Sequence, residues 1–153
     1  MRKLPTLLST AALLLGLTSA CYDCADDQPP TSSLQFQLLS HGGRNLIGRG
    51  PGQYSPDSVR VSLNGQAFDS HVVEQPSSGT GPVVSLAARQ LFASTPGARL
   101  ILHLGRTDTD TVDLGYTLRR SRCADFLDYH TVRFNSRPTG QLAQTGWYQF
   151  VKH

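Results

Sequence analysis

Residues 99–118, with the sequence RLILHLGRTDTDTVDLGYTL, carry the pattern that decides the fold. Apolar side chains occupy every second position on both sides of a polar stretch centred on Thr107 and Asp108. The expected inward set is Leu100, Leu102, Leu104, Val112, Leu114, Tyr116 and Leu118. Alternation with a period of two is typical of a strand that buries one face. The stretch therefore predicts two strands joined by a polar loop.

The same alternation recurs along the chain in residues 34–38, 59–63 and 130–134. In the last of these segments, the expected inward residues are His130, Val132 and Phe134. Residues 147–151 are apolar on both faces and predict a well-covered strand. Asn64-Gly65 is a strong hairpin signal, because both residues tolerate positive φ, and a two-residue turn there would place Val61 opposite Phe68.

Residues 83–92 fit either a helix or a strand, and we favour a strand over 83–87 followed by a short helical turn. No long amphipathic helix is evident elsewhere. Seven to nine short strands predict an all-β fold, a single antiparallel β-sandwich of immunoglobulin-like type over residues 34–153. A small β-barrel is the alternative.

Residues 1–20 have the three-part layout of a secretory signal peptide. Arg2 and Lys3 form a positive start, residues 7–17 form an apolar run, and residues 18–20 are small. The run is too short to span a membrane, which takes about 20 apolar residues. No later run is as long, so we expect no transmembrane helix in the mature chain.

The segment Leu17-Thr18-Ser19-Ala20-Cys21 resembles the lipobox of bacterial lipoproteins. The family favours leucine three positions before the cysteine, where this chain has Thr18. The resemblance implies that Cys21 carries a diacylglycerol thioether and becomes the mature N-terminus. Ordinary cleavage after Ala20, which would give a secreted or periplasmic soluble protein, is the alternative. Residues 21–33 would then form the lipidated N-terminus and a polar spacer.

Charge and cysteine content narrow the expectations further. Removing residues 1–20 takes away Arg2 and Lys3, so 14 basic residues become 12 against 11 acidic ones, and we infer no nucleic-acid partner.

With Cys21 acylated, Cys24 and Cys123 are the one possible disulfide pair in an oxidising compartment. If Cys21 is not acylated, the three cysteines compete to form one disulfide, and one thiol is left over. Cys21 and Cys24 alone are too few for a zinc site, and we expect no metal and no cofactor.

A wider pattern resembles a set of small uncharacterised envelope lipoproteins of Gram-negative bacteria. It runs from the lipobox cysteine and Cys24 through Pro29-Pro30 and the Phe36–Leu38 alternation to Gly43-Arg44-Asn45-Leu46. Residues 109–116, Cys123 and the strand ending Phe134-Asn135 continue it. The resemblance implies a β-sandwich and a Cys24–Cys123 bridge, and it implies no activity.

Few residues form a pattern that points to chemistry. Asp108, Asp110 and Asp113 are carboxylates suited to calcium, although the spacing lacks a liganding loop and a polar hairpin is the simpler interpretation. A hydrolase would need a nucleophile beside a histidine, and the candidates are His103 and the Asp128–His130 pair. Two further groups of residues have both a binding interpretation and a structural one. One is the basic cluster Arg119, Arg120 and Arg122, and the other is the aromatic stretch Trp147, Tyr148 and Phe150.

These observations predict a lipoprotein of the cell envelope, tethered to a membrane through Cys21, with the outer membrane favoured. We expect a non-enzymatic structural or interaction module with an envelope protein as its partner. A ligand-binding accessory for sugar, peptide or lipid is the alternative, and a small hydrolase comes after it. The sequence names no small-molecule ligand.

Overall fold

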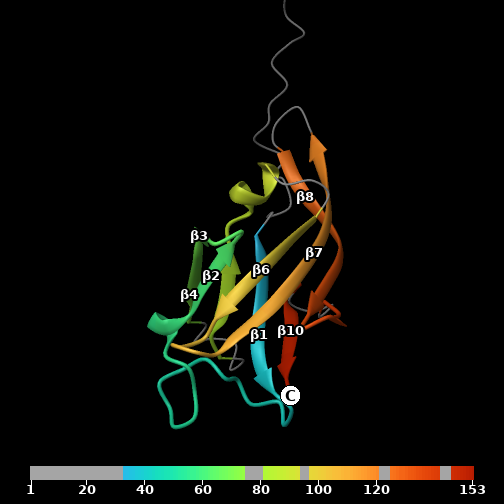
Figure 1. The fold of residues 1–153 in the computed structure, drawn as a ribbon. Coiled ribbons are helices and arrows are strands. Elements are labelled where there is room, and N and C mark those ends of the chain that lie inside the picture. Colours follow the sequence, from blue (N-terminus) through green and yellow to red (C-terminus); the bar gives the residue numbers. More distant parts are fainter. Residues whose placement is uncertain (1–32, 75–80, 94–96, 121–124, 142–145) are drawn as a thin grey trace, which may run out of the picture.

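The computed structural model describes residues 33–74, 81–93, 97–120, 125–141 and 146–153, which form two packed β-sheets (Figure 1). The strands are β1 (Leu34–Ser40), β2 (Arg60–Leu63), β3 (Gln66–Phe68), β4 (Ser70–Val73), β5 (Val83–Leu86), β6 (Gly97–His103), β7 (Thr109–Arg120), β8 (Asp125–Phe134), β9 (Arg137–Pro138) and β10 (Tyr148–Lys152). The predicted all-β fold is confirmed, and the sheets do not close into a barrel.

The two sheets have the strand orders β10-β1-β5-β4 and β3-β2-β6-β7-β8-β9. Neighbouring strands run antiparallel except for β1 and β10, which pair in parallel from Phe36–Tyr148 to Ser40–Lys152. The predicted strand and helical turn of residues 83–92 are confirmed as β5 and the 3-10 helix η2 (Ala88–Ala93). A second 3-10 helix, η1 (Pro56–Ser58), precedes β2.

The two long sides of the sandwich differ. On one side β3 passes directly into β4 through Asp69, so one stretch of chain belongs to both sheets. The amide of Ala87 donates to the Asp69 carbonyl at 3.0 Å and fixes the crossing. On the other side the sheets end at β10 and at β8–β9, and we call the gap between these strands the open seam.

The core is built from the alternating residues of both sheets. Leu100, Leu102 and Leu104 are 0–1% exposed, which confirms the alternation in residues 99–104. Phe150 of β10 stacks on Phe36 of β1 and on Phe134 of β8, with ring centroids 4.3 and 4.9 Å apart. These rings join the two sheets next to the open seam, so the seam has an apolar floor.

The predicted Asn64-Gly65 hairpin is confirmed. Both residues have positive φ, 53° and 78°, and Val61 lies opposite Phe68 as expected. The structure also has a second turn of this kind at Asn135-Ser136, with φ of 48° and 66°, between β8 and β9.

The prediction that His130 faces the core with Val132 and Phe134 is wrong. The β7–β8 pairing shifts between Gly115–Thr131 and Tyr116–Tyr129, so His130 is an extra residue in a β-bulge. The bulge turns Leu127 and Tyr129 toward the core and leaves His130 exposed. A bulge reverses the parity of one strand relative to its partner, which a strict two-residue period does not reveal.

The predicted signal peptide, Cys21, Cys24, the predicted spacer up to Ser32 and the segment that holds Arg122 and Cys123 lie outside the described residues. Within the described part of the chain, no helix has the length and apolar character needed to span a membrane.

Candidate functional site

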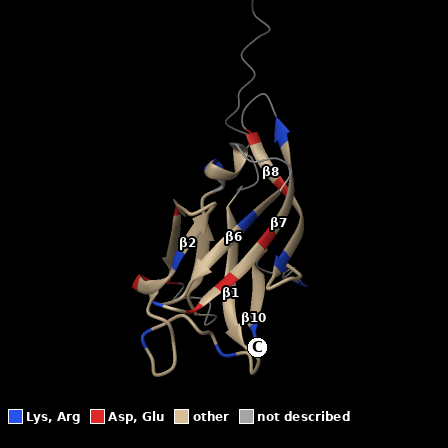
Figure 2. Cartoon of the chain, viewed as in Figure 1, with Lys and Arg blue, Asp and Glu red and all other residues tan. Residues whose placement is uncertain are grey.

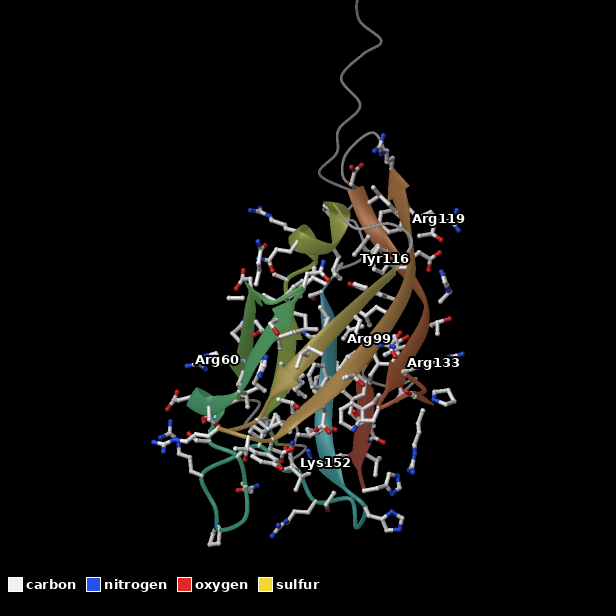
Figure 3. All side chains as sticks on the ribbon, in the orientation of Figure 1. Arg60, Arg99, Tyr116, Arg119, Arg133 and Lys152 are labelled. Carbon is white, nitrogen blue, oxygen red and sulfur yellow. The ribbon has the colours of Figure 1, made fainter. Side chains whose placement is uncertain are left out.

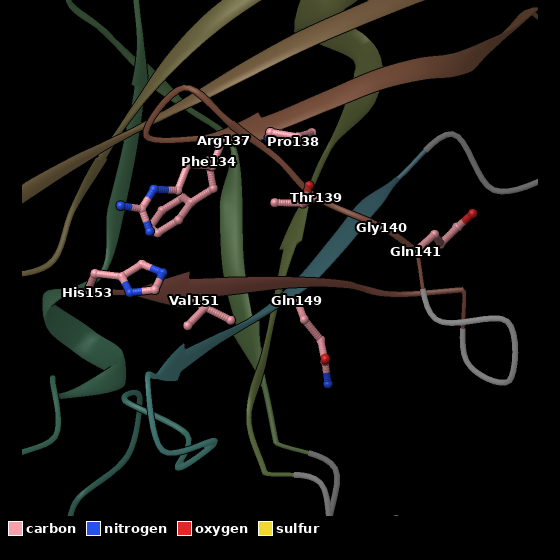
Figure 4. A pocket seen from close by; sticks show the side chains of 9 residues that line it. All are labelled: Phe134, Arg137, Pro138, Thr139, Gly140, Gln141, Gln149, Val151 and His153. Carbon is pink, nitrogen blue, oxygen red and sulfur yellow. The ribbon is translucent and has the colours of Figure 1, made fainter.

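The open seam contains the main cavity, which we call the β9–β10 groove (Figure 4). Its volume is about 390 Å³. Its lining comes from the end of β8, from β9 and the loop after it, and from β10, and consists of Phe134, Arg137, Pro138, Thr139, Gly140, Gln141, Gln149, Val151 and His153. The Asn135-Ser136 turn folds β9 back over β8 and so brings Arg137 to the groove.

The groove is positive at one end and neutral at the other. Figure 4 shows Arg137 and His153 together at one end and Gln141 at the opposite end. The His153 ring also lies 5.1 Å from the ring of His41. Loss of hydration and the positive field of Arg137 and His41 lower the pKa of His153. None of the nine lining side chains is acidic.

A polar network borders this end of the sandwich, and we call it the Lys152 cluster. The Lys152 ammonium, at the end of β10, donates to Asp108 Oδ1 and Asp110 Oδ2, each at 2.7 Å. The Tyr54 hydroxyl donates to the other oxygen of Asp108. The Asn135 amide donates to Asp110 Oδ1 at 2.8 Å. Asp110 is only 6% exposed, so its charge is satisfied by protein groups rather than by water.

The Lys152 cluster shifts the ionisation of its members. Hydrogen bonds from Lys152 and then from Tyr54 lower the pKa of Asp108. Burial, followed by the hydrogen bond to Asp108, raises the pKa of Tyr54. For Lys152, partial burial acts to lower the pKa, but the hydrogen bonds to Asp108 and Asp110 outweigh it and the pKa is raised. The cluster therefore favours a protonated lysine between two carboxylates.

The three aspartates considered for calcium do not converge. Asp108 and Asp110 point to Lys152, whereas Asp113 pairs with Arg99 at 2.5 Å on the outer face of the six-stranded sheet. Figure 2 shows a basic position on β6 beside acidic positions on β7. Among the described residues, no group of three His, Cys, Asp or Glu side chains could hold a metal ion.

The structure brings one histidine to a serine. Ser62 Oγ lies 2.9 Å from a ring nitrogen of His103 on the outer face of β2 and β6. A serine nucleophile needs a base that a third group orients, usually a carboxylate. Within the described chain no carboxylate hydrogen bond to His103 occurs, and His103 lies opposite Arg60 and Thr109. His130 contacts the Thr131 hydroxyl at 3.3 Å.

The other two predicted groups separate along the fold. Arg119 forms an exposed ion pair with Asp128 at 3.2 Å, and Arg120 lies opposite Asp125 at the end of the β7–β8 hairpin (Figure 3). Tyr148 and Phe150 are buried in the core, which supports their structural interpretation. Trp147 is partly exposed just before β10.

The sequence analysis missed both the groove and the Lys152 cluster. Asp110 lies on the same face of its strand as Val112 and Leu114, two and four residues later. A carboxylate that points inward requires a cation or several hydrogen-bond donors. That signal could have predicted a buried partner, but not which one. The partner is 42 residues away and reaches Asp110 only because β10 joins the opposite sheet.

Comparisons with protein-family models, with curated proteins and with solved structures found no match to this chain. The structure therefore defines only a structural class, a two-sheet β-sandwich with a groove between β9 and β10.

Proposed function

We propose that this protein is a lipoprotein of the cell envelope, anchored through Cys21, whose β-sandwich is a non-enzymatic interaction module. The observation that carries the proposal is the β9–β10 groove beside an edge strand. A groove with an apolar floor, a few polar groups and an unpaired strand edge is suited to recognising another molecule. The outer membrane is the favoured location.

The position of the tether supports this arrangement. Ser33, where the described chain begins, lines a cavity with Phe126, Leu127, Asp128 and Tyr129 at the start of β8. Because β1 and β10 run in parallel, both lead away from this end toward Lys152. The positive end of the groove therefore lies far from the point where the spacer joins the domain. The twelve residues 21–32 could reach at most about 40 Å.

We include a Cys24–Cys123 disulfide in the proposal. Both cysteines lie outside the described residues, and the support comes from the described residues that flank their segments. The spacer enters at Ser33, and Ser33 shares a cavity with Phe126, three residues after Cys123. A bridge would fasten the spacer to the β7–β8 hairpin.

Two experiments test the anchor and the surface. Cells grown with a labelled fatty acid should tag the protein, and Cys21→Ala should abolish the tag. A photo-crosslinker placed at Gln149 in the groove should capture an envelope protein, whereas one at Thr111 on the outer face serves as the matched control. An untagged wild-type protein would rule out the anchor, and equal capture at both positions would rule out the groove.

A ligand-binding accessory is the second candidate, and the size of the groove favours it. A volume of about 390 Å³ lies within the range of small-molecule sites. Competition by a small acidic sugar or lipid headgroup for the crosslink at Gln149 would support this candidate.

A further inference from the structure

We propose that the β9–β10 groove binds an extended peptide, which adds as a strand to the free edge of β10 and places an acidic side chain between Arg137 and His153. This inference rests on the proposed function, because it specifies the partner of the same groove. Three observations support it: the free edge of β10, the positive charge at one end of the groove, and the side chains that line the groove.

The edge of β10 is available along most of its length. β10 is the last strand of its sheet, and β1 covers only one of its edges. On the other edge, the described residues provide a single bridge, between Gln141 and Tyr148. Every second residue from Gln149 to Lys152 thus offers its backbone donor and acceptor to an added strand. The opposite wall is less suited, because Pro138 of β9 lacks an amide hydrogen.

The charge of the groove selects an acidic side chain. Arg137 has no carboxylate partner among the described residues, and it lies with His153 at one end of the groove. His41 adds a third group that can carry positive charge, 5.1 Å from His153. A carboxylate bound there could accept a bidentate hydrogen bond from the Arg137 guanidinium. Val151, which is partly exposed, would contact an apolar side chain on the same face of the peptide.

The groove walls favour a peptide over a glycan. Sugar rings are commonly recognised by exposed aromatic faces, but Phe134 is only 2% exposed and stacks on Phe150. Trp147 is not part of the lining. A second copy of this chain is also a poor occupant. Because β10 has no acidic side chain, pairing of two β10 edges would bring no side-chain carboxylate from that strand to Arg137.

A designed peptide provides the test. We would use the peptide Ac-Thr-Val-Thr-Asp-Thr-Val-Thr-NH2, in which the two Val side chains and the Asp side chain share one face. One control peptide has Asn in place of Asp, and a second has N-methylated backbone amides. Binding to the full-length chain in detergent would be measured by calorimetry. We expect the Asp peptide to bind about tenfold more tightly than the Asn peptide, because a charged hydrogen bond is lost. We expect N-methylation to abolish binding.

Matched variants locate the site. Arg137→Gln should remove the preference for Asp over Asn, whereas Arg133→Gln, an exposed arginine on the outer face of β8, should preserve it. The proposal is overturned if the Asp peptide shows no binding at about 1 mM, if Asp and Asn bind equally, or if oligogalacturonate binds and displaces the peptide. The same titration with Cys21→Ala distinguishes failure of the lipid anchor from failure of peptide binding. Peptide binding should be unchanged in this variant, because the groove does not need the anchor, whereas fatty-acid labelling should be lost.

Discussion

At the residue scale, Asp110 is the most informative side chain of the molecule. It occupies an inward position of β7, next to Val112 and Leu114, where an unpaired charge would be strongly unfavourable. Lys152 and Asn135 satisfy its two oxygens. The cluster thereby ties the last residues of β10 to the start of β7 in the other sheet, next to the positive end of the groove.

We expect Lys152→Met to lower the free energy of unfolding by about 2–3 kcal/mol, because Asp110 would keep its charge without the cation. Asp110→Asn should relieve part of that loss. A double-mutant cycle measured by urea denaturation should give a coupling of at least about 1 kcal/mol. The exposed pair Arg99 and Asp113 is the control, and its cycle should give a smaller coupling. Additive effects of Lys152→Met and Asp110→Asn would contradict the arrangement.

The same cluster predicts how stability depends on pH. The pKa of Asp108 lies below its ordinary value of 3.8, so its contribution is present above that value and is lost as pH falls through the lower, folded pKa. The pKa of Lys152 lies above 10.5, so its contribution is lost only as pH rises through that higher value. The urea midpoints of wild type and Lys152→Met should remain apart at pH 7 and should begin to draw together only as pH falls below about 4, toward the folded pKa of Asp108. A constant difference down to acid pH would contradict this.

At the element scale, the two hairpin turns form a natural comparison. Both place two residues at positive φ, but one is Asn64-Gly65 and the other is Asn135-Ser136. A left-handed conformation costs a residue with a Cβ atom more than it costs glycine. The Asn135-Ser136 turn is held by other contacts, since Thr111 N donates to Asn135 Oδ1 at 2.8 Å.

We expect Ser136→Gly to raise the free energy of unfolding by about 0.5–1 kcal/mol, because glycine removes the steric strain at φ 66°. The reverse change in the other turn, Gly65→Ser, should lower it by about 1 kcal/mol. Thermal unfolding followed by circular dichroism measures both. Destabilisation by Ser136→Gly would indicate that the serine has a role that the backbone geometry does not explain.

Prediction from sequence succeeded where the signal is local. The alternation in residues 99–118, the Asn64-Gly65 turn and the change from strand to helical turn after Leu86 each depend on neighbouring residues, and the structure confirms them. The bulge at His130 was not predictable, because it is defined by the partner strand. The groove and the Lys152 cluster were missed for a related reason, since β10 pairs with a strand about 110 residues earlier in the chain.

At the scale of the whole molecule, Ser33 and the start of β8 lie at one end of the sandwich, and the positive end of the groove lies at the other. The proposed spacer and disulfide would join the domain at the first of these ends. Peptide mapping without reduction should link Cys24 to Cys123. Because the closed loop holds about 100 residues, Cys24→Ser should lower the free energy of unfolding by up to about 4–5 kcal/mol. Cys21→Ser is the control and should leave it unchanged, since an acyl chain does not cross-link the backbone. Two free thiols in envelope-purified protein would disprove the bridge.

The parallel pairing of β1 with β10 has a mechanical consequence. A pull between a membrane-bound spacer and a partner held on β10 would enter β1 at its first residue and leave β10 near its last. The β1–β10 hydrogen bonds from Phe36–Tyr148 to Ser40–Lys152 would then be loaded in shear, all together rather than one after another. A sandwich with this connection resists extension along the direction in which a tethered protein would be pulled.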